Sequence, residues 1–284
     1  MSKRVRRISL LIILLMGIPL FLIWQNNDIV ITKFTYRSSK IGRDFDGYKI
    51  AQISDLHNKQ FGNKQKRLIE HLRGIHPDLI VVTGDIIDAN RTNVDITMEF
   101  IRGAMKIAPI YYVSGNHEAW SGRYNELLDK LIKEGVIIMD DKSIEIQKND
   151  TKIYLIGLSD PDFLSNNIQN QDRKKQIDQK LKKLALHENE LQILLSHRPE
   201  LIQIYAKNNI DIAFTGHAHG GQFRIPYISG LYAPNQGFFP KYSSGAYKMS
   251  KTTMFVSRGL GNSKIPFRIF NRPEIIVLNL EKEK

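Results

Sequence analysis

Five apolar runs in this 284-residue chain end in the same way, in a short turn that carries Asp, Asn or His side chains. Short apolar runs of this kind are typical of buried β-strands. Ligand-binding side chains in α/β proteins gather at the carboxyl ends of strands. We therefore expect the five turns to form one site at one edge of a sheet. In chain order they are Ser54-Asp55-Leu56-His57, Gly84-Asp85, Gly115-Asn116-His117-Glu118, Ser196-His197 and Gly216-His217-Ala218-His219.

Strand-like and helix-like segments alternate along the chain, which predicts an α/β fold. A Lys148-Asn149-Asp150 turn between two apolar segments predicts a hairpin, so we expect mixed sheets. Helical spacing of apolar residues is seen in 64–74, 94–105, 124–133 and 172–186. Strands are expected near 28–35, 49–53, 79–83, 110–113, 144–147, 152–157, 192–195, 212–215, 254–257 and 274–280.

Residues 8–24 form an apolar run behind a basic N-terminus that contains Lys3, Arg4, Arg6 and Arg7. Its length is at the short limit of the roughly 17 to 25 residues of a spanning helix. No small-residue cleavage motif follows it. We expect residues 1–27 to be a basic cytoplasmic tip with a transmembrane signal anchor. By the positive-inside rule, residues 28–284 would then be one domain on the outer side of the cell membrane.

The absence of cysteine excludes disulfides, thiolate metal sites and thiol nucleophiles. The formal net charge is +12, but no long basic block lies outside the N-terminus, so nucleic-acid binding is not expected. Any metal must be held by His, Asp and Asn side chains, which suit Mn, Fe, Zn or Ni. The sequence leaves the oligomeric state open.

The turns contain five of the eight histidines, together with Asp55, Asp85 and Asn116. Because Asp85 follows a glycine, its carboxylate can project from a sharp turn and bridge two ions. Two ions about 3.5–4 Å apart can stabilise both the attacking and the leaving oxygen of a phosphoryl displacement. No nucleophile motif is present, and such a reaction needs no covalent intermediate.

Together these motifs resemble the calcineurin-like metallophosphoesterase superfamily over residues 48–225, in its order and at plausible spacings. The extended Gly216–Gln222 motif and Ser257-Arg258-Gly259-Leu260-Gly261 resemble a bacterial membrane-associated subgroup of phosphodiesterases and UDP-2,3-diacylglucosamine pyrophosphatase-like enzymes. The resemblance implies a four-layer α/β/β/α sandwich of two mixed sheets flanked by helices. Here the sandwich would be preceded by one transmembrane helix.

The resemblance also implies two divalent metal ions, with Mn favoured and Zn, Fe or Ni open. It assigns side chains to each ion: Asp55, His57 and His219 to the first, Asn116, His197 and His217 to the second, and Asp85 to both. A hydroxide bridging the ions would attack phosphorus. His117 would contact the phosphate and protonate the leaving oxygen, while Glu118 would orient His117 through its other ring nitrogen.

Residues 222–247 combine seven aromatic side chains with Arg224 and Lys241. This segment is either a packed loop region or an aromatic and basic rim that contacts a membrane or a lipid phosphate. Arg224 and Arg258 are candidates for substrate contacts. Together with the anchor, the segment favours a lipid-linked or envelope phosphodiester or pyrophosphate as substrate.

Two other functions stay open. The first is a phosphomonoesterase of the same fold that acts on proteins or nucleotides. The second is a catalytically silent, metal-stabilised binding module at the cell surface. The complete set of ligand-type residues and the adjacent His117 favour an enzyme, because binding alone needs no proton donor beside the metals.

Overall fold

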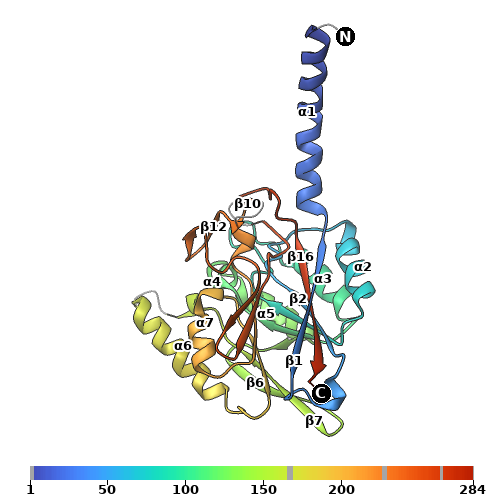
Figure 1. The fold of residues 1–284 in the computed structure, drawn as a ribbon. Coiled ribbons are helices and arrows are strands. Elements are labelled where there is room, and N and C mark those ends of the chain that lie inside the picture. Colours follow the sequence, from blue (N-terminus) through green and yellow to red (C-terminus); the bar gives the residue numbers. More distant parts are fainter. Residues whose placement is uncertain (1–2, 165–168, 226–228, 263–264, 284) are drawn as a thin grey trace.

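The computed structural model describes residues 3–164, 169–225, 229–262 and 265–283, and two six-stranded sheets form the centre of this part of the chain. Helices cover the outer faces of both sheets, and one long helix extends away from the body (Figure 1). The predicted α/β fold with mixed sheets and flanking helices is confirmed.

The first sheet has the order β1-β16-β2-β3-β4-β5. Strands β2 to β5 run parallel, while β16 runs antiparallel to β2 and parallel to β1. Its strands are β1 (Val30–Ser38), β2 (Lys49–Ile53), β3 (Leu79–Thr83), β4 (Ile110–Val113), β5 (Ile137–Ile138) and β16 (Glu274–Lys282).

The second sheet has the order β14-β15-β9-β8-β7-β6. Its four central strands are parallel and both edge strands are antiparallel to their neighbours. Its strands are β6 (Lys142–Lys148), β7 (Thr151–Gly157), β8 (Leu191–Leu195), β9 (Ile212–Thr215), β14 (Gly245–Met249) and β15 (Thr252–Val256).

The remaining elements are helices and two short ribbons. The α-helices are α1 (Lys3–Asn27), α2 (Lys66–Ile75), α3 (Val94–Ala104), α4 (Asn116–Trp120), α5 (Tyr124–Lys133), α6 (Asn170–Leu184) and α7 (Ile202–Lys207). The two-stranded ribbons pair β10 (Arg224–Ile225) with β11 (Ser229–Gly230), and β12 (Tyr232–Ala233) with β13 (Gly237–Phe238). Five 3₁₀ helices are η1 (Arg43–Phe45), η2 (Asn63–Gln65), η3 (Pro161–Phe163), η4 (Pro199–Leu201) and η5 (His219–Gly221).

Strand β3 shows why the central strands are apolar throughout. Successive side chains of a strand point to opposite faces of the sheet. Leu79 and Val81 pack between the two sheets, whereas Ile80 and Val82 pack on the side of helices α2, α3 and α5. A third apolar cluster joins the second sheet to α6 and α7. These three interior layers give the four-layer arrangement.

Most predicted elements are found within about two residues of their expected limits. Helix α7 and strand β14 were not predicted. Helix α7 has six residues, which is too short for a helical repeat to be read from the sequence. Strand β14 is an edge strand that is only partly buried, so it lacks the apolar run of the central strands.

Helix α1 covers the predicted transmembrane span. It exposes Leu15, Met16, Leu20 and Ile23. Within the described part of the chain, no helix is long and apolar enough to cross a membrane. The side chains of residues 4–5 and 7–14, which include the first half of the predicted span, lie outside the described set.

The last turn of α1 is attached to the domain by hydrogen bonds. Gln25 is buried, and its Oε1 accepts from the backbone N–H of Asn271 at 3.1 Å. Asn26 Oδ1 accepts from Asn262 Nδ2 at 2.9 Å and from the N–H of Arg268 at 3.1 Å. Asn271 in turn donates through Nδ2 to the carbonyl oxygen of His219 at 2.7 Å. The end of α1 is thereby connected to one of the predicted ligand turns.

Candidate metal centre

The five predicted turns meet in one buried cluster. Strands β2, β3 and β4 end side by side in the first sheet, and β8 and β9 end side by side in the second. The clustered side chains are almost inaccessible to solvent, with exposures between 0% and 6%. The structure brings together all the residues that were predicted as ligands or as catalytic: Asp55, His57, Asp85, Asn116, His117, Glu118, His197, His217 and His219.

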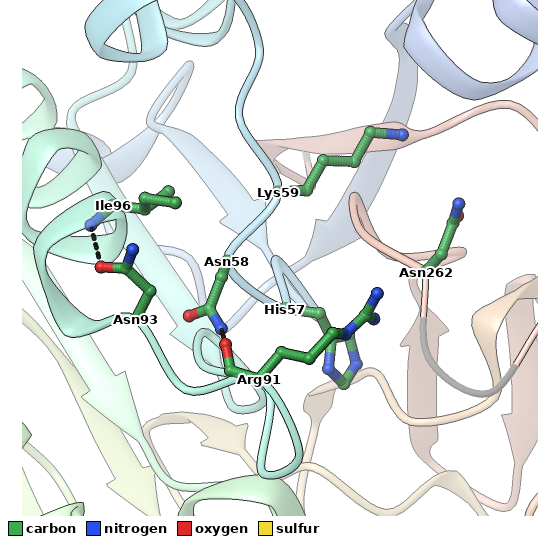
Figure 2. A pocket seen from close by; sticks show the side chains of 7 residues that line it. All are labelled: His57, Asn58, Lys59, Arg91, Asn93, Ile96 and Asn262. Carbon is green, nitrogen blue, oxygen red and sulfur yellow. Dashed lines mark hydrogen bonds between the residues drawn. The ribbon is translucent and has the colours of Figure 1, made fainter. Parts of the chain in front are cut away.

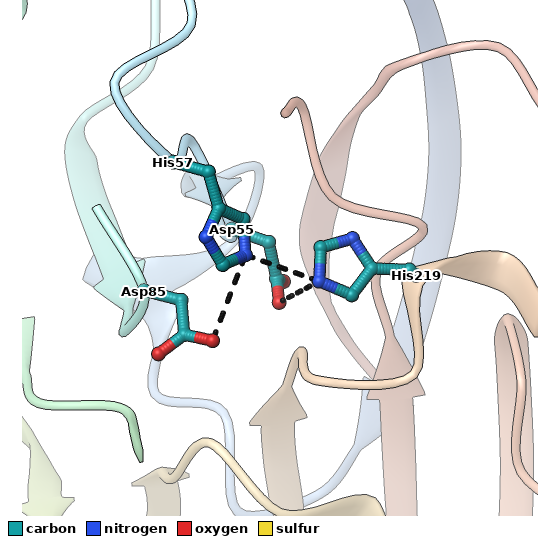
Figure 3. Close-up of side chains that lie close together, drawn as sticks. All are labelled: Asp55, His57, Asp85 and His219. Atoms are coloured by element: carbon teal, nitrogen blue, oxygen red, sulfur yellow. Dashed lines mark hydrogen bonds and ion pairs between the residues drawn. The ribbon is translucent and has the colours of Figure 1, made fainter. Parts of the chain in front are cut away.

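Asp55, His57, Asp85 and His219 form a first group, whose ligand-type atoms lie within 4.8 Å of one another (Figure 3). His57 Nε2 is 3.1 Å from His219 Nε2 and 3.6 Å from Asp85 Oδ2. His219 Nε2 is 3.4 Å from Asp55 Oδ1. Two imidazoles and two carboxylates are therefore directed toward one point.

Asp85, His197 and His217 form a second group within the same distance limit. His197 Nε2 lies 3.2 Å from Asp85 Oδ2, the same oxygen that faces His57. Asn116 is buried and begins helix α4 beside this group. Asp85 is thus common to both groups.

Several buried polar atoms of the cluster lack a hydrogen-bond partner. They are Asp55 Oδ2, His57 Nδ1, Asn116 Oδ1, His197 Nε2 and His219 Nδ1. Buried polar groups are nearly always paired in proteins, and each unpaired group costs about 1–3 kcal/mol. Asp55 Oδ2, Asn116 Oδ1 and His197 Nε2 are thus available as metal ligands, and carboxylate, amide and imidazole groups at one place fit a di-metal centre.

The pKa values of His197 and Asp85 show how charge is distributed in the cluster. Burial tends to lower the pKa of His197, but the adjacent Asp85 carboxylate raises it to about 10. Burial tends to raise the pKa of Asp85, yet His197 holds it well below its usual value. The carboxylate is therefore charged, and protonated His197 is its positive partner. Because a ligating imidazole is neutral, a divalent cation bound here would take over this role from the His197 proton.

The backbone of the ligand turns adopts a conformation that is uncommon for residues with side chains. The φ angles are +51° at Asp55, +47° at His57, +52° at Asp85, +64° at His217 and +48° at His219. Each such residue costs on the order of 1–3 kcal/mol, and such strain clusters at functional sites. Asp and His tolerate this region better than most residues.

The family profile described as Calcineurin-like phosphoesterase matches residues 48–221, more than half of the chain. The chain belongs to the calcineurin-like phosphoesterase family. The protein is accordingly a metal-dependent phosphoester hydrolase.

Two bacterial relatives match over most of their length. The uncharacterized metallophosphoesterase YkuE of Bacillus subtilis is 28% identical over 266 residues, covering 88% of this chain and 85% of that protein. An uncharacterized metallophosphoesterase of Aquifex aeolicus is 25% identical over 268 residues, covering 88% of this chain and 91% of that one. The crystal structure of TT1561 of Thermus thermophilus is 10% identical, with a TM-score of 0.51, covering 75% of this chain and 90% of that chain. That likeness shows a shared fold.

The predicted partnership between Glu118 and His117 in this phosphoesterase is wrong. The second ring nitrogen of His117, Nδ1, accepts a hydrogen bond from the N–H of Ala89 at 3.0 Å. The Glu118 carboxylate instead accepts from four backbone N–H groups of the turns after β3 and β4. The donors are Asp85 at 2.7 Å, Ile86 at 2.9 Å, Ile87 at 3.2 Å and Gly115 at 2.6 Å. Glu118 therefore fixes the turn that carries Asp85.

The contact with Ala89 sets the tautomer of neutral His117. Because Nδ1 accepts a hydrogen bond, the ring proton lies on Nε2. The ring lies edge-on to His57, with centroids 4.4 Å apart, and 5.2 Å from the Trp120 ring. His117 therefore places an Nε2–H donor beside the predicted ligands.

Arg198 was not predicted, although it directly follows His197 in the sequence. Its guanidinium is buried and donates to both carboxylate oxygens of Asp160, at 2.6 and 2.8 Å. It also lies 3.1 Å from His217 Nε2. A buried Arg–carboxylate pair of this geometry is a rigid support for the His217 ring. Its position next to a predicted ligand was the only available signal.

Two cavities of different chemistry border the cluster. The Trp120 pocket has a volume of about 320 Å³ and opens onto the cluster itself, with an apolar wall of Trp120, Tyr232, Pro234 and Ile265. Its polar lining consists of Asp85, Asn116, His117, His217, His219 and Gln222. The Arg91 pocket has a volume of about 400 Å³ and is polar, with Arg91, Lys59 and three asparagines beside His57. Neither pocket could be predicted from the sequence, because the walls of each come from segments that are far apart along the chain.

Arg224 and Arg258 bind groups of the domain itself. Arg224 Nη1 donates to the Gly220 carbonyl oxygen at 3.2 Å and to Ser244 Oγ at 2.6 Å. Arg258 Nη2 donates to Glu274 Oε1 at 2.8 Å. Neither arginine lines the Trp120 pocket or the Arg91 pocket. Their contact with substrate stays a prediction.

Proposed function

We propose that the protein is a di-metal phosphodiesterase, with Mn as the favoured ion. Asp55, His57 and His219 would hold one ion, Asn116, His197 and His217 the other, and Asp85 both. The observation that carries this proposal is the position of Asp85 Oδ2, which lies 3.6 Å from His57 Nε2 in the first group and 3.2 Å from His197 Nε2 in the second.

Two bound divalent ions would polarise the phosphoryl oxygens and lower the pKa of a water molecule to near neutrality. The side chains of the protein supply the rest of the chemistry. His117 Nε2–H would hydrogen-bond the phosphoryl group and donate its proton to the leaving oxygen. Glu118 would keep the Asp85 turn in place through its four backbone hydrogen bonds.

The two pockets favour a diester over a monoester. A phosphate monoester has one substituent, whereas a diester or a pyrophosphate has two that must be accommodated. Cavities of about 320 and 400 Å³ border the cluster at His117 and His57 respectively. Each substituent would therefore have a separate place beside the reacting phosphate.

We further propose a lipid-linked or envelope substrate, as in the UDP-2,3-diacylglucosamine pyrophosphatase-like subgroup. Residues 1–27 would anchor the protein in the cell membrane and residues 28–284 would lie outside the cytoplasm. The apolar side chains that α1 exposes support the anchor. The exposed Phe238, which pairs with Tyr232 in the β12–β13 ribbon, and the exposed Phe239 that follows it support contact with lipid.

Metal reconstitution of the full-length protein in detergent tests the reaction. The protein is stripped of metal and given Mn, Zn, Ni or Fe singly, and hydrolysis of a bis-aryl phosphodiester and a mono-aryl phosphate is measured. We expect metal-dependent cleavage of the diester and much weaker cleavage of the monoester.

Asp85→Asn is expected to lower kcat by at least about 10²-fold, because it removes the charge shared by both groups. Asp95→Asn is the matched control, since Asp95 is an exposed residue of α3. A monoester cleaved faster than the diester would favour the phosphomonoesterase. A folded protein that binds two ions and cleaves neither compound would favour the binding module.

A further inference from the structure

The Arg91 pocket is a polar cavity that opens directly beside the metal-ligand candidate His57. In Figure 2 the Arg91 side chain extends in front of the His57 ring, with Asn262 beyond its guanidinium and the ammonium end of Lys59 directed away from it. The described lining contains one guanidinium, one amine and three amides, and none of its described residues is a carboxylate.

Arg91 is held at its base while its guanidinium stays open to solvent. Asn58 Nδ2 donates to the Arg91 carbonyl oxygen at 2.7 Å, and the N–H of Arg91 donates to Asp88 Oδ1 at 3.1 Å. One guanidinium nitrogen contacts Asp88 Oδ2 at 3.1 Å, and the side chain is nevertheless 68% exposed. Its remaining N–H groups are free to donate into the pocket, in a fork that matches phosphate oxygens.

Asp88 pairs with one end of the Arg91 guanidinium and offsets part of its charge, but Asp88 itself does not line the pocket. It is almost fully buried, with a side-chain exposure of 3%. Its Oδ1 already accepts from the N–H groups of Asn90 at 2.9 Å and Arg91. The carboxylate thus positions Arg91 from below the pocket, and the pocket itself receives the cationic end.

Lys59 adds an amine to the pocket lining, and burial, followed by the positive charge of Arg268, lowers its pKa to about 7. Its Nζ donates to the Asn26 carbonyl oxygen and lies 5.0 Å from the centre of the Phe61 ring. No ion pair between Lys59 and a carboxylate occurs within the described segments. An anion in the pocket would provide this ammonium group with an opposite charge.

Helix α3 begins at the same pocket. Its N-cap is Asn93, whose Oδ1 accepts from the N–H groups of Asp95 and Ile96, and Asn93 and Ile96 both line the cavity. The N-terminus of an eleven-residue helix carries a partial positive charge. It adds to the field of Arg91 and Lys59.

We propose that the Arg91 pocket binds a second phosphate group, carried by one substituent of the phosphodiester substrate. This inference rests on the proposed function and names the class of substrate. The Arg91 guanidinium, the Lys59 amine, which a bound anion would hold in its charged form, and the helix N-terminus together match the charge of about −2 and the three acceptor oxygens of a phosphate monoester. The Trp120 pocket opens onto the metal-ligand candidates themselves, and its apolar wall would take the other, apolar substituent.

The test compares two substrates that differ only in the second phosphate. The first is the 2-methoxyethyl p-nitrophenyl phosphodiester, and the second carries a phosphate group in place of the methyl group, so that neither compound has a free hydroxyl that could attack its own phosphorus. Release of p-nitrophenol by the full-length, Mn-loaded protein gives kcat/KM for both. We expect the wild type to prefer the phosphorylated diester at least about tenfold.

Arg91→Gln and Lys59→Met are each expected to reduce this preference at least fivefold, mainly through KM for the phosphorylated diester. Arg91→Lys is expected to restore part of it, because it keeps the charge but not the fork. Arg123→Gln is the matched control, since Arg123 is an exposed arginine at the start of α5 that pairs with Glu126. This variant should keep the wild-type preference.

Equal kcat/KM values for the two diesters in the wild type would overturn the proposal. A preference that persists undiminished in both Arg91→Gln and Lys59→Met would do the same. If the wild type cleaves neither diester with any metal, the proposed function has failed, and calorimetry decides on the pocket alone. Tighter binding of the phosphorylated diester to the wild type than to Arg91→Gln would then support the subsite, and equal binding would refute it.

Discussion

His117 and Glu118 are adjacent in sequence but have separate tasks. The N–H of Ala89 fixes the tautomer of His117, so that its Nε2–H is available beside the two ligand groups. The Glu118 carboxylate accepts four backbone N–H groups and so holds Asp85, whose oxygen both ligand groups share. His117 thus provides the proton donor, and Glu118 keeps the turn that carries Asp85 in position.

The loss of kcat on removing the His117 proton donor should depend on the leaving group of the substrate. His117→Ala is expected to lower kcat by about 10²–10⁴-fold for a diester with an alkoxide leaving group. The loss should be much smaller for p-nitrophenolate, which leaves without being protonated. Rates for both diesters in the wild type and the variant check this.

His76→Ala is the control, because His76 lies at the end of α2 outside the cluster. An equal loss for both leaving groups would show that His117 does not act as a general acid.

At the scale of elements, the turns after the neighbouring strands β2 and β3 form backbone hydrogen bonds with each other. The N–H of Asp55 donates to the Gly84 carbonyl oxygen and the N–H of His57 to that of Asp85, both at 3.0 Å. These bonds continue the pairing of β2 with β3 beyond the ends of the strands. They impose left-handed backbone angles on the ligand residues and keep two carboxylates close together.

Gly84 is the residue that allows this close approach. Its φ is +82°, and a Cβ atom there would lie 2.6 Å from the Gly115 nitrogen. Gly84→Ala is expected to cost about 1–3 kcal/mol of stability and to weaken metal binding. Thermal unfolding and calorimetric titration with Mn measure both effects.

The matched control is Gly74→Ala in helix α2, where a Cβ atom would meet nothing within 4 Å. It should stabilise the protein by up to about 1 kcal/mol, because alanine has the higher helix propensity. Unchanged metal binding in Gly84→Ala would show that a Cβ atom at position 84 does not disturb the ligand turns.

At the scale of the whole molecule, the centre depends on both sheets. The first sheet contributes the turns with Asp55, His57, Asp85 and Asn116, and the second those with His197, His217 and His219. The apolar layer between the sheets brings the two sets together. The last turn of α1 also connects to this centre, through Gln25, Asn271 and His219.

The proposed anchor predicts that the full chain stays with the membrane fraction after alkaline carbonate extraction. Ile18→Lys combined with Leu20→Lys should release a large part of it, since each lysine costs about 2.5–3.5 kcal/mol at the centre of a spanning helix. Protease added to intact cells should cleave the domain. Immunoblots of pellet and supernatant give the result.

Leu186→Lys is the control, because Leu186 is an equally exposed leucine of the domain. Complete extraction of the wild-type chain by carbonate would contradict the anchor.

The sequence by itself determined the alternation of strands and helices and the five ligand turns. Both can be predicted from short stretches of sequence, because strand periodicity and turn chemistry depend on residues a few positions apart. A cluster of His, Asp and Asn at strand ends could therefore be predicted, and the structure places Asp85 between its two halves. The edge strand β14 and the short helix α7 carry too weak a pattern to be read in this way.

Only the tertiary structure decided which groups surround the cluster. The partner of His117 is a backbone N–H 28 residues away, and Arg198 connects Asp160 to His217. Lys59 and Arg91 line one pocket, whose described walls come from three segments that are far apart in the sequence. Such contacts depend on how the elements pack. A buried polar atom must form a hydrogen bond, and its partner is the group that the packing places beside it. The type of centre was thus determined locally, and its surroundings were determined by packing.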